Sequence, residues 1–297
     1  MQSLPPAFPA LLPAPWSPLR REALDARSPR GFSLVELLAV LTIIVALIGL
    51  LLPSVQRARE SSRLASCGNN LKNQGLAIGN FESSRRSFPA GNDQGGKRFH
   101  AWSSFILPFI ENSGISDRID YRKAWDDAGG NARLAELTLP LYVCPSGFSA
   151  FPGKQDYGGV LGAWIEADGS FPSAADWERS GVLHATNERF PRPARAAMVT
   201  DGLAHTLLVS EGVDRDHAGI DQHAFGDACW ACGSNCFALT STIINSPNRD
   251  GFRSRHMAGV QGLFADGHVA FIVDATAPQV LVAICTKSRG DRGSTTF

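Results

Sequence analysis

The chain has 297 residues, with 28 basic and 28 acidic side chains and a formal net charge of zero. A nucleic-acid-binding protein normally carries an excess of basic residues, and a chain with an acidic disordered tail carries an excess of acidic residues. The balanced charge argues against each of these two classes. Hydrophobic residues make up 44% of the chain, enough for a packed core, whereas charged residues make up only 19%, compared with roughly 25% in soluble domains. The shortage of charge is local, because one segment near the N-terminus has no ionisable side chain at all.

That segment is residues 37–56 (LLAVLTIIVALIGLLLPSVQ). A helix of this length, at about 1.5 Å per residue, spans about 30 Å, the thickness of the hydrocarbon core of a bilayer. The alternative is a core helix of a soluble protein, but buried helices this long usually have a polar face. We therefore predict a membrane-spanning helix. Glu36 stands at its edge, where burial in lipid costs roughly 2.5–3.5 kcal/mol; the carboxylate needs a partner there or stays at the level of the headgroups.

The residues around the apolar segment do not match a secretory signal. Residues 1–31 are rich in proline and end in a basic stretch, and no small-x-small cleavage site follows the apolar segment directly. Basic residues are equally frequent on its two sides, so the positive-inside rule does not decide the orientation.

Residues 30–38 (RGFSLVELL) resemble the processing site of type IV prepilins and type II secretion pseudopilins. The resemblance implies that prepilin peptidase cuts after Gly31 and methylates the new N-terminal residue, Phe32. It implies that Glu36 pairs with the terminal ammonium group of a neighbouring subunit in a filament, and that Pro53 occupies the place where pilins often carry a proline. It also implies that the leader stays in the cytoplasm and that the bulk of the chain lies outside.

The helix is expected to continue past Pro53 to about Phe81. Apolar residues recur there at steps of three or four from Leu64 onwards, which predicts an amphipathic stripe against a packed domain. Residues 87–91 (SFPAG) should end the helix. The expected domains are a leader at 1–31, a transmembrane half-helix at 32–56, an extracytoplasmic half-helix at 57–86 and a globular head at 87–297.

The head extends the resemblance to a large bacterial prepilin-like family whose C-terminal part is a domain of unknown function, sometimes labelled solute-binding-like. The resemblance rests on short landmarks: residues 67–80 (CGNNLKNQGLAIGN), Trp102 with 107–111 (LPFIE), 144–146 (CPS), 157–159 (YGG), 201–202 (DG), 207–211 (LLVSE), 254–256 (SRH) with Gly259, and 266–269 (DGHV). The chain departs from the family at His205 and Ala258, which argues against a shared ligand site in those loops.

The pattern predicts an α+β fold, a pilin-like long N-terminal helix packed on an antiparallel β-sheet head with long loops. Short helices are expected at 102–111 and 278–285, and strands at 141–144 and 206–210. Residues 262–265 and 268–273 are expected to form a hairpin, with a type I′ turn at Asp266 and Gly267. His256 and His268 flank this hairpin and are assigned to turns and strand ends in preference to ligation.

The six cysteines favour disulfides, because an even number in an exported domain usually pairs. The resemblance implies a bond between Cys67 and Cys144 that pins the helix to the head. Cys229, Cys232 and Cys236 are further disulfide candidates, although with His223 they would also make a zinc set.

A polar segment, residues 214–227, raises the question of a metal site. Some pseudopilins hold Ca²⁺ in a loop, and oxygen ligands here would suit that ion, but the spacing matches no EF-hand and a solvated loop is the simpler interpretation. No cofactor is therefore predicted, with Ca²⁺ as the alternative. The weak ligand candidates are Asp214, Asp216, His217, Asp221 and His223.

No nucleophile elbow, P-loop, dinucleotide fingerprint or HExxH motif is present, so the chain is not predicted to be an enzyme. The predicted function is a pilin-like structural subunit of a type IV pilus or type II secretion-like filament, anchored by a single pass in a bacterial inner membrane. Its expected partners are prepilin peptidase, the lipid bilayer and other pilin-like subunits contacted through the N-terminal helix, and no nucleic acid. The alternative is a membrane-tethered module that binds a solute or glycan. The candidates for exposed stacking platforms are Trp164, Trp177 and Trp230, although core packing would explain these side chains equally well.

Overall fold

The computed structural model describes residues 33–93, 98–148, 151–164, 170, 180–188, 190–213, 229–239, 243–246 and 252–290. The chain separates into two compact units, Met1–Pro53 and Ser54–Phe297. Each unit is described by itself.

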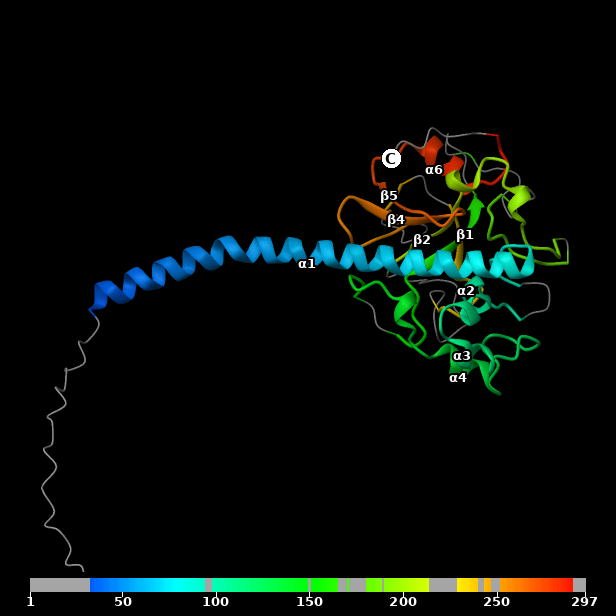
Figure 1. Cartoon of the computed structure of the whole chain (residues 1–297), viewed down its shortest axis with the longest axis horizontal. Coiled ribbons are helices and arrows are strands. Elements are labelled where there is room, and N and C mark those ends of the chain that lie inside the picture. The colour runs from blue at the N-terminus through cyan, green and yellow to red at the C-terminus, as the bar shows by residue number, and fades with distance from the viewer. Residues whose placement is uncertain are drawn as a thin grey trace, which may run out of the picture. The chain divides into compact units, whose positions relative to one another are not determined.

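The first unit contains the start of helix α1 (Leu34–Arg85), which Figure 1 shows as one uninterrupted helix. Ser33 caps it: the Glu36 backbone N–H donates to Ser33 Oγ (3.2 Å), and the Ser33 backbone N–H donates to Glu36 Oε2 (2.9 Å). This reciprocal pair is a capping box, which satisfies two donors of the first turn. All side chains from position 34 to position 59 are exposed. The most apolar window of α1 has a mean hydropathy of 2.9 with none of it buried, so by length and composition the helix can act as a single-pass membrane anchor.

The second half of α1 belongs to the second unit and is amphipathic. The helix continues through Pro53, which lacks an N–H and so removes one intrahelical hydrogen bond. Beyond it, buried residues recur at helical spacing, as the sequence predicts. They are Cys67, Leu71, Gln74, Gly75, Ala77 and Ile78.

The sheet of the second unit has five strands in the order β3-β1-β2-β4-β5. Their bounds are β1 Tyr157–Ala163, β2 Leu207–Glu211, β3 Cys236–Leu239, β4 Gly259–Phe264 and β5 Val269–Val273. Four strands pair antiparallel, as expected, but β3 pairs parallel with β1. The strand expected at 206–210 and both strands of the hairpin are confirmed. The fold class is α+β.

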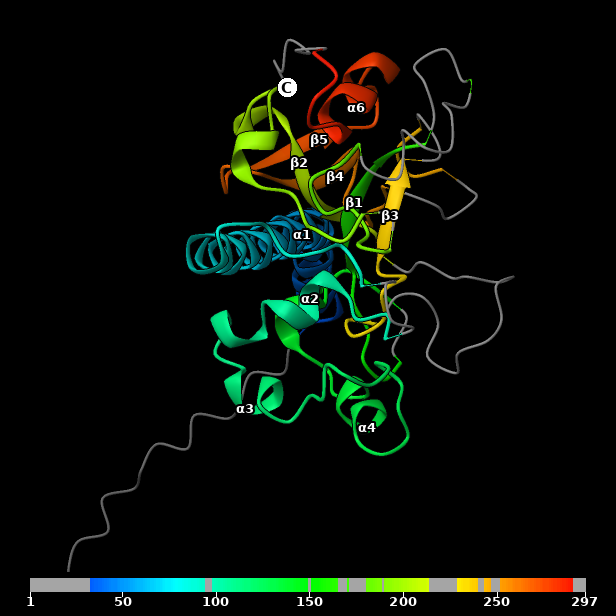
Figure 2. The same cartoon turned by 90° about the vertical axis from the view of Figure 1, so that its right-hand side faces the viewer.

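Helices cover both faces of this sheet, with α1 on one face and α6 (Pro278–Cys285) on the other (Figures 1 and 2). Successive side chains of a strand point to opposite faces, so Leu263 of β4 packs in the core beneath α1 while Phe264 packs in the core beneath α6. All six residues of β4 are buried, as expected for a strand covered on both faces.

Short helical turns lie on the far side of α1 from the sheet (Figures 1 and 2). They are α2 (Trp102–Phe105), η2 (Leu107–Phe109), α3 (Ser113–Ser116), α4 (Asn131–Ala135) and η3 (Pro140–Tyr142); two more turns, η4 (Ala196–Met198) and η5 (Leu203–His205), precede β2. The strand predicted at 141–144 is wrong. Pro140 starts a 3₁₀ turn there, in which the Val143 N–H bonds to the Pro140 carbonyl, and the Tyr142 side chain is buried in a third core, with its hydroxyl donating to the Ser103 carbonyl.

The turn between β4 and β5 also differs from the prediction. A type I′ turn needs positive φ at both central residues, but only Gly267 (φ 91°) has one. The Gly267 N–H bonds to the Phe264 carbonyl and the Phe264 N–H to the His268 carbonyl, so the connection is a three-residue loop with glycine in the left-handed position. The His268 ring stacks on Phe264 and contacts Asp266, which matches the turn role expected for it.

Candidate functional site

A pair of cysteines joins α1 to the head. Cys67 lies on the buried face of α1 and Cys144 lies in the loop after η3; both are buried. Their Sγ atoms are 2.7 Å apart, compared with about 2.05 Å in a disulfide. The fold therefore brings together the two residues whose pairing the resemblance implies, and a bond between them stays a prediction.

A buried ion pair holds the loop that carries Cys144. The Cys144 backbone N–H donates to Asp156 Oδ2 (2.9 Å), and the same oxygen lies 3.0 Å from Lys154 Nζ. The Asp156 and Lys154 side chains are 1% and 4% exposed, respectively. A lone buried carboxylate would be costly, so the lysine compensates for its desolvation and makes Asp156 a fixed acceptor for the Cys144 backbone.

His256 approaches the two sulfurs from the bend before β4. Its Nδ1 lies 2.6 Å from Glu60 Oε1 on α1, and its Nε2 lies 3.7 Å from Cys144 Sγ and 3.4 Å from Glu211 Oε1 at the end of β2. The imidazole side chain is 2% exposed. The turn assigned to His256 from sequence describes its backbone only, because the ring is a buried link between α1 and the sheet.

Glu211 is the most deeply buried carboxylate of this group, with its side chain 0% exposed. Its Oε2 accepts the backbone N–H of Gln261 on β4 (2.9 Å). Among the described residues, its Oε1 has no hydrogen-bond partner, and it lies on the His256 side of the group. A buried carboxylate oxygen without a hydrogen bond is expensive, and the 3.4 Å contact with His256 Nε2 is the one interaction that the described residues give to this atom.

The ionisation of these groups follows from their proximity. The hydrogen bond with Cys67 lowers the pKa of Cys144 to about 6 against the opposing effect of burial, and His256 adds to the lowering. The pKa of Cys67 is raised by the same contact and by burial. Burial opposes charge on His256, but the contacts with Cys144, Glu211 and Glu60 outweigh it and raise the pKa of the imidazole to about 10. The group therefore concentrates negative charge around one imidazole.

Polar side chains on α1 dock the helix to the surrounding backbone. Asn70 Nδ2 donates to the Val143 carbonyl (3.2 Å) and Gln74 Nε2 to the Leu141 carbonyl (2.9 Å). From the sheet side, Gln261 Nε2 donates to the Leu64 carbonyl (2.8 Å). These directional contacts fix the rotation of α1, and with it the direction in which Cys67 points.

The other predicted site residues lie apart from this group or outside the described residues. Glu36 forms the capping box and Pro53 lies inside α1. Cys229 Sγ contacts the Ala135 carbonyl and Cys236 Sγ the Gly91 carbonyl, and Cys232 is buried. Further disulfides among these three cysteines stay predictions. Outside the described residues lie Gly31, Phe32, Asp214, Asp216, His217, Asp221 and His223.

The tryptophans correct one expectation. Trp230 is not an exposed stacking platform: it is fully buried in the third core, and its indole N–H donates to the Leu137 carbonyl (2.9 Å). Trp164 is 42% exposed, and Trp177 lies outside the described residues.

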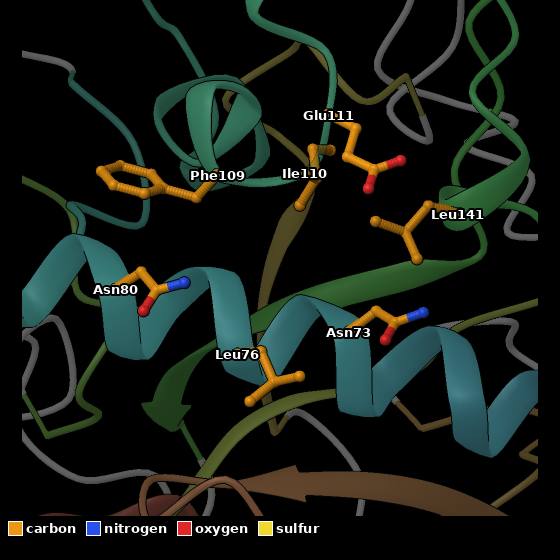
Figure 3. Close-up of a pocket in the computed structure, with 7 residues that line it drawn as sticks. All are labelled: Asn73, Leu76, Asn80, Phe109, Ile110, Glu111 and Leu141. Atoms are coloured by element: carbon orange, nitrogen blue, oxygen red, sulfur yellow. The ribbon is translucent and has the colours of Figure 1, made fainter.

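A depression runs along the docked half of α1. It has a volume of about 450 Å³, and Figure 3 shows residues of α1 on one side of it and residues of η2, the loop after η2 and η3 on the other. Its lining mixes amide, carboxylate and apolar groups: Asn73, Leu76, Asn80, Phe109, Ile110, Glu111 and Leu141. The depression is separate from the buried cysteine and histidine group, and no sequence motif predicted it.

The sequence contains the members of the buried group in recognisable landmarks, but it does not show that they lie together. Cys67, Cys144, Glu211 and His256 each stand in a landmark of the resemblance, but the landmarks are far apart in the chain. Glu60 stands in none of them, and only its position on α1 seven residues, about two turns, before Cys67 indicates a shared face.

A family model described as a protein of unknown function (DUF1559) matches residues 56–279. The matched range contains the docked half of α1, the whole sheet and every member of the buried group. No curated protein and no solved structure matches the chain.

Proposed function

The chain belongs to the DUF1559 family, and on that premise we propose that it is a membrane-anchored pilin-like subunit matured by prepilin peptidase. The proposal assigns residues 1–31 to a leader, 32–56 to the membrane, 57–86 to the extracytoplasmic half of the helix and 87–297 to the head.

The continuity of α1 is the observation that carries this proposal. A signal peptide is removed together with its apolar helix, whereas here the same helix that begins with an exposed apolar stretch goes on to supply core residues such as Leu71 and Ile78, which are 0% and 1% exposed. Cutting after the apolar stretch would sever a helix on which the head is built. The apolar segment is thus suited to be a permanent anchor.

The start of α1 suits processing at Gly31. The resemblance of residues 30–38 to prepilin sites makes Phe32 the mature N-terminus, and Ser33, the next residue, already caps the helix. Glu36 lies in the first helical turn. In lipid its carboxylate would cost roughly 2.5–3.5 kcal/mol, and the ammonium group of a neighbouring subunit's Phe32 would offset that cost.

This assignment places the chain in a bacterial inner membrane as a single-pass protein with a cytoplasmic leader and an extracytoplasmic head. Its partners would be prepilin peptidase, the bilayer and other pilin-like subunits of a type IV pilus or type II secretion-like filament. It would act as a structural subunit and not as an enzyme. We do not favour the alternative of a solute- or glycan-binding module, because the burial of Trp230 removes one of the three side chains that motivated it.

Intact mass of the membrane-extracted protein tests the proposal. The wild type should lack residues 1–31 and carry one added methyl group, whereas Gly31→Val should keep its leader. Gly49→Val is the matched control, because Gly49 lies in the same apolar helix with open space around it, and it should mature normally. A Gly31→Val protein with the mass of the mature wild type, or a wild type that retains its leader in a peptidase-containing host, would refute the proposal.

A further inference from the structure

Four potential metal ligands converge in the core of the second unit. They are Cys67 from α1, Cys144 from the loop after η3, Glu211 from the end of β2 and His256 from the bend before β4. One ligand atom from each lies within 4.8 Å of the others, and all four residues are buried. We propose that these residues form a binding site for a single tetrahedrally coordinated transition-metal ion, with Zn²⁺ as the expected occupant.

The chemistry of the four donors selects this class of ion. Zn²⁺ accepts thiolate sulfur, imidazole nitrogen and carboxylate oxygen, and its structural sites are four-coordinate and closed to solvent. Thiolates disfavour Mg²⁺ and Ca²⁺, which prefer oxygen ligands. The four residues come from four separate chain segments, so an ion bound there would join α1 to three parts of the head.

Glu211 points independently to a ligand at this place. Its carboxylate is fully buried, and the Gln261 N–H occupies Oε2 and leaves Oε1 without a hydrogen bond among the described residues. That oxygen lies 3.4 Å from His256 Nε2, beside the sulfurs. A dication within the group would use this oxygen and offset its desolvation.

The surroundings of the donors resemble the outer shell of a metal site. A metal-binding histidine usually donates its second ring nitrogen to a carboxylate, which fixes the tautomer and the ring orientation. Glu60 holds His256 Nδ1 at 2.6 Å in this way, so Nε2 faces the sulfurs.

Ion binding and a disulfide require different distances between the two sulfurs and therefore exclude each other. Two thiolates on one tetrahedral zinc, at about 2.3 Å each, lie about 3.8 Å apart, so the 2.7 Å separation would widen by about 1 Å. A disulfide would need the sulfurs to close to about 2.05 Å and would leave Glu211 Oε1 with the 3.4 Å contact to His256 Nε2 and no hydrogen bond among the described residues. Because the ion employs all four aligned donors, it replaces the Cys67–Cys144 bond that the resemblance implies.

Metal analysis of the full-length chain tests the site. The protein would carry an affinity tag without histidines and be extracted in detergent without chelator, and elemental mass spectrometry would measure metal per chain. We expect one zinc per wild-type chain and its loss in His256→Ala and Glu211→Gln. Glu60→Gln should lower the zinc affinity by about 10–100-fold. Glu82→Gln on the same helix and Cys285→Ser in the core beneath α6 are the matched controls and should keep their zinc.

The thiol state decides between the ion and the bond. A second portion of the wild type, denatured in N-ethylmaleimide, should show alkylation at both Cys67 and Cys144. Chains without metal in which peptide mapping links Cys67 to Cys144 would overturn the proposal, as would zinc that persists in both ligand variants. If the variants do not fold, the wild type is unfolded, its metal is removed, and it is refolded with Co²⁺ alone. The refolded chain should show a thiolate-to-cobalt charge-transfer band and the ligand-field absorption of tetrahedral Co²⁺. The absence of both bands would overturn the site. The outcome is independent of processing at Gly31, because all four donors lie in the second unit.

Discussion

Two glycines one turn apart on α1 provide a quantitative test of how the helix docks on the sheet. A Cβ atom added at Gly75 would lie 2.7 Å from Leu263 Cδ1, in a fully buried contact with β4, whereas a Cβ atom at Gly79 would meet nothing within 4 Å. Glycine inside a helix costs about 0.5–1 kcal/mol relative to alanine, so Gly79→Ala should raise the free energy of unfolding by that amount. Gly75→Ala gains the same term but adds an overpacking cost of about 1–3 kcal/mol. The two variants should therefore differ by about 1–3 kcal/mol.

Thermal unfolding of the full chain in one detergent, followed by near-ultraviolet circular dichroism, measures this difference. For a unit of this size, 1 kcal/mol corresponds to about 2–4 °C in Tm, so Gly75→Ala should melt about 2–12 °C below Gly79→Ala. The wild type serves as the reference for both. If Gly75→Ala melts at or above Gly79→Ala, then α1 does not pack on β4 as closely as described, and the reasoning fails.

Two further predictions concern the core and its response to acid. Leu71→Ala should lower the free energy of unfolding by about 2–5 kcal/mol, because Leu71 is fully buried. The control Leu76→Ala, at a residue 63% exposed, should change it by less than about 0.5 kcal/mol. Equal denaturant midpoints for the two variants would contradict the buried stripe. Burial lowers the pKa of His100, so the folded state favours the neutral imidazole. The resulting stabilisation is fully present above the unfolded-state pKa of about 6.5. It is lost as the pH falls from about 6.5 through the lower pKa of His100 in the folded state. Between pH 7 and pH 5 the Tm of His100→Gln should fall less steeply than that of the wild type or of the control His268→Gln, and parallel profiles would count against this role of His100.

Local periodicity was enough to predict the elements that carry their own pattern. The apolar segment and the amphipathic stripe predicted α1 through Pro53, and short apolar runs, two of them joined by a turn signal, predicted β2, β4 and β5. Each of these signals lies within one element and depends on which face of it is buried.

The sequence-based predictions were wrong, or none could be made, where contacts with residues far away in the chain determine the local structure. The segment before Cys144 has the composition of a strand, but within the part of the chain that the structure describes no strand pairs with it. It forms a 3₁₀ turn instead, and Tyr142 of this turn packs into the core. The parallel pairing of β3 depends on which edge of β1 is free. The buried group could not be predicted for the same reason, because Glu60 and His256 are 196 positions apart and only the folded sheet brings them into contact.

The polar contacts of α1 also impose an order on the assembly of the head. The Gln261 contact with Leu64 spans 197 positions, and the His256 contact with Glu60 spans 196. Synthesis runs from the N-terminus, so α1 is complete long before β4 has been made. Contacts of such long range are slow to form, because the intervening chain must first close a loop. Until then no sheet covers the stripe of Cys67, Leu71 and Ile78. Exposed hydrophobic surface of this kind leads to aggregation with other unfinished chains. The docked half of α1 must therefore be kept from other chains until the last strands of its own head have been made.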